Sequence, residues 1–220
     1  MRSRAVLALL AACVAGALAL ALVGAADERT VTFTTNVRVV EPVIAALPGE
    51  EACQNGVQAG ATFDTVELFL STGAEPGPPV AVTVWGSVNG RALARGLLPA
   101  GTRDNQAAAV RLTRPVAEGE LIDVCLRDAG TRDVGFYGGP SHESPGHSFV
   151  NGRPGTGDIR IGFLRSEPRS ALALVPDMFE RATRFRPEPV GAWTFWVLLA
   201  AVAAGIPLLL AAALRRATRA

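Results

Sequence analysis

The sequence predicts a mainly β protein, an antiparallel β-sandwich flanked by an apolar helix at each end of the chain. Two apolar segments without a charged residue, Ala5–Val23 and Trp193–Leu214, bracket the 220-residue chain. Between them, short runs of alternating apolar and polar residues are separated by Gly, Pro, Asn or Asp at nearly every break. No helical period is found in this middle region before Ser170, which favours a sheet protein.

Residues 1–26 have the features of an export segment. Arg2 and Arg4 precede the apolar run, and Asp27 begins the polar sequence after it. The small residues 23–26 offer a cleavage site for a secretory signal, yet the apolar run is also long enough to span a bilayer uncut. The sequence leaves a cleaved signal and a retained first helix both open, and either one carries Asp27 across the membrane.

The segment Leu10-Ala11-Ala12-Cys13 resembles a bacterial lipoprotein box, which would place a lipid on Cys13. A mature lipoprotein is expected to begin with polar sequence, whereas this chain stays apolar for ten further residues. We therefore expect Cys13 to be a lipid-facing cysteine.

Residues 27–169 are long enough for one extracytoplasmic domain with its own core, and their spacing predicts a sandwich of roughly eight strands. The clearest hairpin joins Val80–Trp85 to Arg91–Leu98, because Asn89-Gly90 tolerates the positive φ angles of a type I′ turn. The other expected strands are Thr30–Val40, Phe63–Leu70, Gln106–Leu112, Leu121–Arg127, Val134–Tyr137, His147–Val150 and Asp158–Leu164. Two facing sheets would bury Phe63, Val66, Leu68, Val82, Val84, Leu121, Val124 and Phe136.

Cys53 and Cys125 are the only cysteines of this middle region. Two thiols in an exported, oxidising compartment are more often paired than free, so we expect a structural disulfide between them. Closing a loop of 72 residues would stabilise the fold by around 4 kcal/mol in the chain-entropy model. A redox or zinc role would require a Cys-x-x-Cys spacing or partner ligands, which are absent from the sequence.

Residues 170–189 are expected to link the sandwich to the C-terminal anchor. Asp177–Phe185 can form a short amphipathic helix that either lies at the lipid headgroups or packs back on the sandwich. Residues 190–214 then form a transmembrane helix, with aromatic residues at its start and Arg215 and Arg216 after its end. Because positive residues stay inside, residues 215–220 are predicted to be a cytoplasmic basic tail.

Composition limits the class of partner. All 21 basic residues are arginines, and Asp27–Arg169 holds 17 acidic residues against 13 arginines, a net charge of −4. A mildly acidic domain argues against nucleic acid, which requires a basic surface. The arginines near the two apolar segments favour membrane lipid as a partner.

One polar cluster contains residue types that could bind a metal ion or take part in catalysis. Ser141–His147 holds both histidines of the chain, and His142, His147 and Asp158 could meet at one metal ion. The spacing is one residue longer than the zinc motif His-Glu-x-x-His, and Pro145-Gly146 prevents the helix which that motif needs. No nucleophile elbow, phosphate loop or dinucleotide fingerprint occurs. A polar loop is therefore expected, with no cofactor and no enzymatic activity, and a metal-dependent hydrolase is the third hypothesis.

The strand runs around Phe63–Leu68, Val80–Val84, Gly90–Gly96 and Leu121–Leu126 resemble jelly-roll modules of the galactose-binding-like and carbohydrate-binding kind. The resemblance covers about residues 50–165 and implies recognition of a sugar or another ligand through loops or a sheet face. Trp85 and Tyr137 are the only Trp and Tyr of the domain, and they are the candidate ligand-binding residues. Trp85 either points outward or covers the edge of the core.

The C-terminal stretch resembles that of actinobacterial membrane proteins associated with cell-envelope glycan synthesis. The first hypothesis is accordingly a membrane-anchored extracytoplasmic binding module for envelope carbohydrate, or an accessory to a membrane glycosyltransferase. The alternative is a structural or partner-binding membrane subunit with no ligand, whose Ala- and Gly-rich anchor helix packs on other helices.

Overall fold

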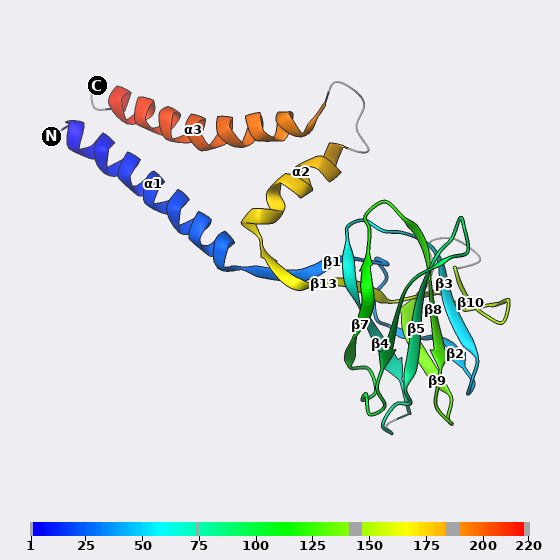
Figure 1. Cartoon of the computed structure of the whole chain (residues 1–220). Helices are drawn as coiled ribbons and strands as arrows, with labels where there is room; N and C mark the ends of the chain where they lie inside the picture. The colour runs from blue at the N-terminus through cyan, green and yellow to red at the C-terminus, as the bar shows by residue number, and fades with distance from the viewer. Residues whose placement is uncertain (1, 74, 141–146, 184–189, 218–220) are drawn as a thin grey trace. The chain divides into compact units, whose positions relative to one another are not determined.

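The computed structural model describes residues 2–73, 75–140, 147–183 and 190–217. The chain divides into two compact units. The first is Thr30–Glu167, and the second combines Met1–Arg29 with Pro168–Ala220. Figure 1 shows the first unit as two sheets and the second as mainly helical.

The larger sheet has seven strands. Its main order is β1 (Glu28–Thr34), β13 (Ile161–Ser170), β4 (Phe63–Ser71), β9 (Val134–Gly139) and β12 (Asp158–Ile159). Two further strands pair off this path, β2 (Glu41–Ala46) with β9 and β7 (Ala107–Val116) with β4.

The second sheet has six strands in the order β11 (Arg153–Pro154), β10 (Ser148–Val150), β3 (Glu51–Gln58), β8 (Leu121–Asp128), β5 (Val80–Gly86) and β6 (Ala92–Leu98). The two antiparallel sheets confirm the predicted sandwich. The number of strands is higher than the eight expected, in part because Glu41–Ala46 and Glu51–Gln58 lack a clear apolar alternation and yet pair with β9 and β8, each with one shift of register.

The core lies between the sheets and is centred on phenylalanines. The ring of Phe163 stacks on that of Phe33, with centroids 4.3 Å apart, and meets the edge of Phe63 at 4.8 Å. Seven of the eight expected core residues are buried, but Leu121 is 37% exposed. Side chains alternate along a strand, so Leu121 cannot share a face with Val124; Ile122 is the buried residue instead.

The hairpin between β5 and β6 is confirmed, although its turn is longer than predicted. Only Gly90 has a positive φ, of 60°, and Asn89 instead accepts a hydrogen bond from the Arg91 N–H through its side chain, at 3.0 Å. The first expected strand is shorter than predicted. It ends at Thr34 rather than Val40 and is followed by Asn36 in a left-handed conformation.

Side chains from β7 close the free edge of β6. The Arg114 guanidinium donates to the carbonyl oxygens of Leu93 and Ala92, the latter at 2.9 Å. The Arg95 N–H donates to the Thr113 hydroxyl at 3.2 Å. These bonds satisfy backbone groups that an exposed edge strand would otherwise offer to another chain.

The second unit contains α1 (Arg2–Ala26), a 3-10 turn η1 (Leu172–Leu174), α2 (Val175–Thr183) and α3 (Ala192–Ala217). Residues Val6–Ala26 and Ala192–Ala217 are two helices long and apolar enough to cross a membrane. The short helix predicted at Asp177–Phe185 is found as α2, and its Phe179 packs against Phe195 and Trp196 of α3. Residues 184–189 lie outside the described residues.

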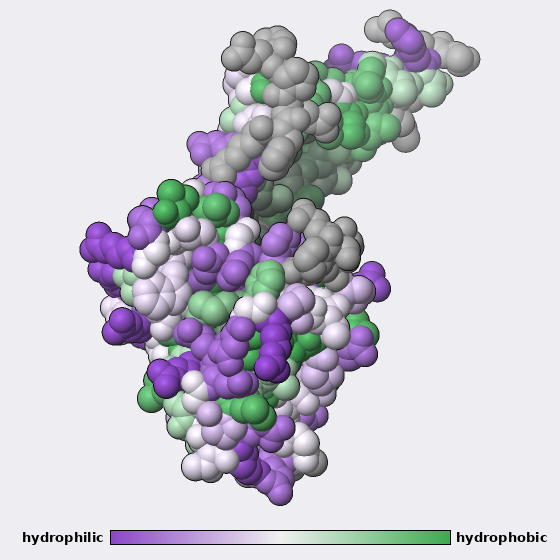
Figure 2. Space-filling model, turned by 90° about the vertical axis from the view of Figure 1, so that its right-hand side faces the viewer, coloured by the Kyte–Doolittle hydropathy of each residue, from purple (hydrophilic) through white to green (hydrophobic). Residues whose placement is uncertain are grey.

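Figure 2 shows how differently the two units distribute hydropathy. Hydrophilic and hydrophobic residues are interspersed over the sandwich face turned to the viewer, and the helical unit presents a mainly hydrophobic surface. The exposed large hydrophobic residues of the sandwich, such as Val88 and Leu97, are scattered one at a time, which is normal for a protein surface in water.

Candidate functional site

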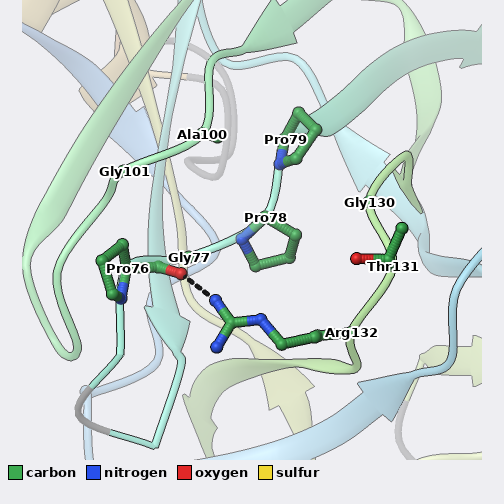
Figure 3. Close-up of a pocket in the computed structure, with 9 residues that line it drawn as sticks. All are labelled: Pro76, Gly77, Pro78, Pro79, Ala100, Gly101, Gly130, Thr131 and Arg132. Carbon is green, nitrogen blue, oxygen red and sulfur yellow. Dashed lines mark hydrogen bonds between the residues drawn. The ribbon is translucent and has the colours of Figure 1, made fainter.

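Three loops at one end of the sandwich border an open pocket of about 530 Å³. They connect β4 to β5, β6 to β7 and β8 to β9. We call this site the loop pocket, and Figure 3 shows the residues that line it: Pro76, Gly77, Pro78, Pro79, Ala100, Gly101, Gly130, Thr131 and Arg132.

Backbone hydrogen bonds hold the three loops together. The Gly77 N–H donates to the Thr102 carbonyl at 2.7 Å, and the Gly101 N–H donates back to the Gly77 carbonyl at 2.9 Å. The Ala129 N–H donates to the Pro79 carbonyl at 3.0 Å. Since prolines also fix φ at Pro76, Pro78 and Pro79, the pocket is formed before any ligand arrives.

Gly130 allows the loops to approach each other closely. A β-carbon at this position would lie 2.4 Å from the Pro78 Cβ, closer than real β-carbons approach, and 3.2 Å from the Pro79 Cδ, a tight contact. The Gly130 N–H also donates to Oδ1 of Asp128 at 2.8 Å. Asp128 is fully buried, so this bond fixes the β8–β9 loop to the end of its strand.

Arg132 is the one charged residue of the loop pocket. Its guanidinium donates to the Pro76 carbonyl, as Figure 3 shows, and forms an ion pair with Glu75. The Arg132 side chain is 46% exposed and that of Glu75 66%, so the pair lies at the rim of the pocket. The exposed part of the guanidinium is available to hydrogen-bond acceptors on a ligand.

The residues that line the loop pocket can bind a ligand through hydrogen bonds and apolar contacts. Its lining provides backbone N–H and C=O groups, the Thr131 hydroxyl, the Arg132 guanidinium and the apolar faces of three prolines. Among the nine residues that line it there is no carboxylate, imidazole or thiol that could act as a general acid, a base or a nucleophile. A mostly apolar hollow with a few polar groups is typical of small-molecule sites.

The structure does not bring Trp85 and Tyr137 together. Trp85 is half-buried on β5 and alternates with the core residue Val84, so its side chain lies on the outer face of the six-stranded sheet. Tyr137 is half-buried on the outer face of β9 in the other sheet, and its hydroxyl donates to Oδ2 of Asp104 at 3.3 Å. One small ligand cannot contact both rings.

His147 and Asp158 do lie together, within a hydrogen-bond network. Oδ1 of Asp158 accepts from the His147 backbone N–H at 2.8 Å and from Nε2 of Gln54 at 3.0 Å. Nδ1 of His147 is 3.9 Å from the same oxygen. Gln54 is 3% exposed and also accepts from the Ile159 N–H at 2.8 Å, so this network ties β12 to β3. His142, the third candidate metal ligand, lies outside the described residues.

The sulfur atoms of Cys53 and Cys125 are 2.10 Å apart, at the distance of a disulfide bond, as predicted from the compartment. The two residues face each other directly on β3 and β8. Among the described residues, Glu51, Cys53 and Cys125 form one group of potential metal ligands with their ligand atoms within 4.8 Å of one another. Two sulfurs bonded to each other are not thiolates, so this group does not make a metal site.

Sequence reasoning missed the loop pocket. Residues 75–79 have the composition of an ordinary break between two strands, and Arg132 stands alone without a motif around it. The available signal was the concentration of Pro and Gly in three segments that follow strands, at 76–79, 99–101 and 130. This signal indicates a site only once the three loops are known to lie at the same end of the sandwich.

No protein-family model matches the chain, and no curated protein matches it. Among solved structures, the chain is similar to CsCBM6-3, a carbohydrate-binding module from Clostridium stercorarium in complex with cellobiose. The identity is 14% and the TM-score 0.30, over 50% of this chain and 90% of that chain. At that TM-score the likeness carries no argument about a ligand, and the strand pairing itself establishes the sandwich.

Proposed function

We propose that this chain is a membrane-anchored binding module, with its sandwich outside the cytoplasm and its loop pocket taking cell-envelope carbohydrate. The observation that carries the proposal is the loop pocket, a rigid hollow with scattered polar groups and apolar proline faces. A sugar presents hydroxyl groups and apolar C–H faces together, which matches that mixture. The volume of about 530 Å³ falls within the usual range for ligand sites.

Three further features support the anchoring and the compartment. Two apolar helices of membrane-spanning length flank the sandwich. The cystine Cys53–Cys125 suits an oxidising compartment outside the cytoplasm. The positions of Arg2, Arg4, Arg215 and Arg216 favour a cytoplasmic location for both ends. A membrane glycosyltransferase is the partner we propose for such a module, because that enzyme class makes envelope glycan at the membrane.

The test uses the full chain in detergent and a variant that fills the loop pocket. Ala100→Trp places an indole in the pocket, and Ala109→Trp places the same side chain on the exposed face of β7 as a matched control. Both variants and the parent would be screened on an array of neutral and acidic bacterial oligosaccharides. We expect Ala100→Trp to weaken binding at least tenfold, equivalent to about 1.4 kcal/mol, and Ala109→Trp to leave it unchanged.

Equal binding by the parent and both variants would place the carbohydrate elsewhere. A chain that binds no oligosaccharide but co-purifies with one membrane protein in stoichiometric amount would favour the alternative function, a partner-binding membrane subunit.

A further inference from the structure

We infer that α1 is retained in the mature protein and packs antiparallel on α3, so that the anchor is a two-helix hairpin. The sequence alone leaves a cleaved signal and a retained helix both open. The inference rests on the membrane anchoring proposed above and adds to it the partner of α3, which is the N-terminal helix of the same chain.

Hydrogen bonds connect the end of α1 to the residues that follow it and to the segment before α2. The Asp27 N–H donates to the Val23 carbonyl at 2.9 Å, which completes the last helical turn, and β1 begins at the next residue, Glu28. The Asp27 carbonyl in turn accepts from the Ala171 N–H at 2.8 Å, on the segment that leads to the second helix. No spacer separates the helix from the fold.

The small residues that would form a cleavage site lie inside this last turn. Residues 24–26 are helical, and a β-carbon on Gly24 would be in contact with Leu172 Cβ of η1 at 3.8 Å. A protease binds its substrate as an extended strand. Cleavage after Ala25 or Ala26 would therefore require the turn to unwind and the contact with η1 to separate.

Burial along α3 shows where the first helix contacts it. Ala211 is 6% exposed, whereas Leu209, two positions earlier and on the opposite side of the helix, is 72% exposed. Among the described elements, α1 and α2 make the main contacts with α3, and α2 meets it at the opposite end through Phe195 and Trp196. Helix α1 is thus the segment that covers Ala211, and the small alanine side chain lets the two helices approach closely.

Helix α1 has a matching side in its first half. Val6, Leu9, Leu10 and Cys13 are partly buried, while residues 14–20 are exposed. Spacings of three and four residues place these four side chains on one face of a helix, so Cys13 lies on the side that meets α3 and not on the lipid-facing side expected from the sequence. The first half of α1 therefore meets the second half of α3, which makes the pair antiparallel. Figure 1 shows α1 and α3 running in opposite directions, with the start of α1 near the end of α3.

The hairpin agrees with the charge pattern of the sequence. Arg2 and Arg4 open α1, and Arg215 and Arg216 stand in the last turn of α3. An antiparallel pair brings these two ends to the same side of the membrane. Basic residues mark the cytoplasmic side, so the retained helix satisfies the rule at both ends of the chain.

The first experiment determines whether α1 is retained. A full chain with a C-terminal tag is expressed in a bacterium, and its membranes are washed with alkaline carbonate before its mass is measured. The matched control is Ala25→Leu with Ala26→Leu, which removes the small residues that cleavage needs and keeps good helix formers. We expect parent and control to have the uncleaved mass. A parent shorter by about 25 residues than the control, with the control intact, would overturn the inference.

The second experiment tests the contact between the helices. Cys13 is the cysteine outside the disulfide, and single cysteines are introduced at Pro207 and Ala211, which lie four positions apart on the less exposed side of α3, or at Ile206 and Leu209 on its exposed side. After mild oxidation in membranes, peptide mapping without reductant should link Cys13 to positions on the first side only. Equal linkage to all four positions, or linkage only between two chains, would overturn the hairpin.

The outcomes separate this inference from the proposed function. A chain that carbonate extracts from the membrane fails as an anchored module. A chain that stays in the membrane with its N-terminus removed keeps the proposed function and loses only the hairpin.

Discussion

The carboxylate of Asp64 connects two neighbouring strands of the seven-stranded sheet. Its Oδ1 accepts from the Ser166 N–H at 2.8 Å and from the Thr65 hydroxyl at 2.9 Å, and its Oδ2 accepts from the Ser166 hydroxyl. Partial burial acts to raise the pKa of Asp64, but the hydrogen bonds from Ser166 and Thr65 and the positive charge of Arg111 outweigh it. The pKa therefore lies below the ordinary value of 3.8.

Because the pKa of Asp64 is lowered in the folded state, the free energy of unfolding should depend on pH. The ionised carboxylate stabilises the folded state above the pKa of the unfolded chain, and that stabilisation is lost as pH falls through the lowered folded pKa. We expect Asp64→Asn to reduce the free energy of unfolding by about 1 kcal/mol at neutral pH, with the difference shrinking below about pH 4. Urea unfolding across pH would measure it. Glu120→Gln, at an exposed site, is the control, and a difference independent of pH would contradict the account.

The cystine closes a sequence separation of 72 residues. Loss of a native disulfide from a small secreted domain typically costs about 2–5 kcal/mol. We expect Cys125→Ala to lower the melting temperature, and the double replacement of Cys53 and Cys125 to lower it by a similar amount because both remove the same bond. Cys13→Ala should leave it unchanged. Two freely alkylated thiols in exported, unfolded protein would refute the bond itself.

At the scale of elements, Arg114 of β7 links the two sheets at the edge strand β6. Its guanidinium donates to two backbone carbonyls of β6, which is the last strand of the six-stranded sheet. We expect Arg114→Ala to lower the free energy of unfolding by about 1 kcal/mol and to speed amide hydrogen exchange in Ala92–Leu98. Arg91→Ala, in the adjoining turn, is the matched control. Unchanged exchange in the Arg114 variant would show that the edge is closed by other contacts.

Strands with an apolar alternation could be predicted from the sequence, and strands held by polar residues could not. Val80–Gly86 alternates between buried and half-buried residues along its whole length, so this strand can be predicted from the sequence pattern. Strand β3 carries Ala52 and Gln54 on its inner face, and Gln54 is buried because Asp158 and the Ile159 N–H satisfy its amide. That bond joins residues 104 positions apart, and no local pattern reports it.

At the scale of the whole molecule, the same distinction applies to the candidate site. The two apolar terminal helices follow from local composition, and the cystine follows from the two cysteines of an expected export domain, so the sequence predicts them directly. The loop pocket depends on three loops meeting through the bonds of Gly77, Gly101 and Ala129 to residues far away in the chain. The aromatic residues that the sequence offered as ligand contacts, Trp85 and Tyr137, lie on outer faces of different sheets.

The topology of the chain provides the last prediction. The placement of arginines predicts that residues 27–190 lie outside the cytoplasm and that the C-terminus lies inside. Val88, beside Asn89-Gly90 in the β5–β6 turn, is 88% exposed, so Val88→Cys gives an accessible probe without straining Gly90. In a Cys13→Ala background, a maleimide that cannot cross membranes should label Val88→Cys in intact cells.

The matching probe is Ala220→Cys at the other end of the chain. We expect it to react only after the membrane is permeabilised, because the apolar helix Ala192–Ala217 separates it from the outside. Labelling of Ala220→Cys but not of Val88→Cys in intact cells would reverse the topology. The sandwich would then stand in a reducing compartment, where a disulfide between Cys53 and Cys125 is not expected to persist. The labelling pattern and the cystine must therefore agree, and each provides an independent check on the other.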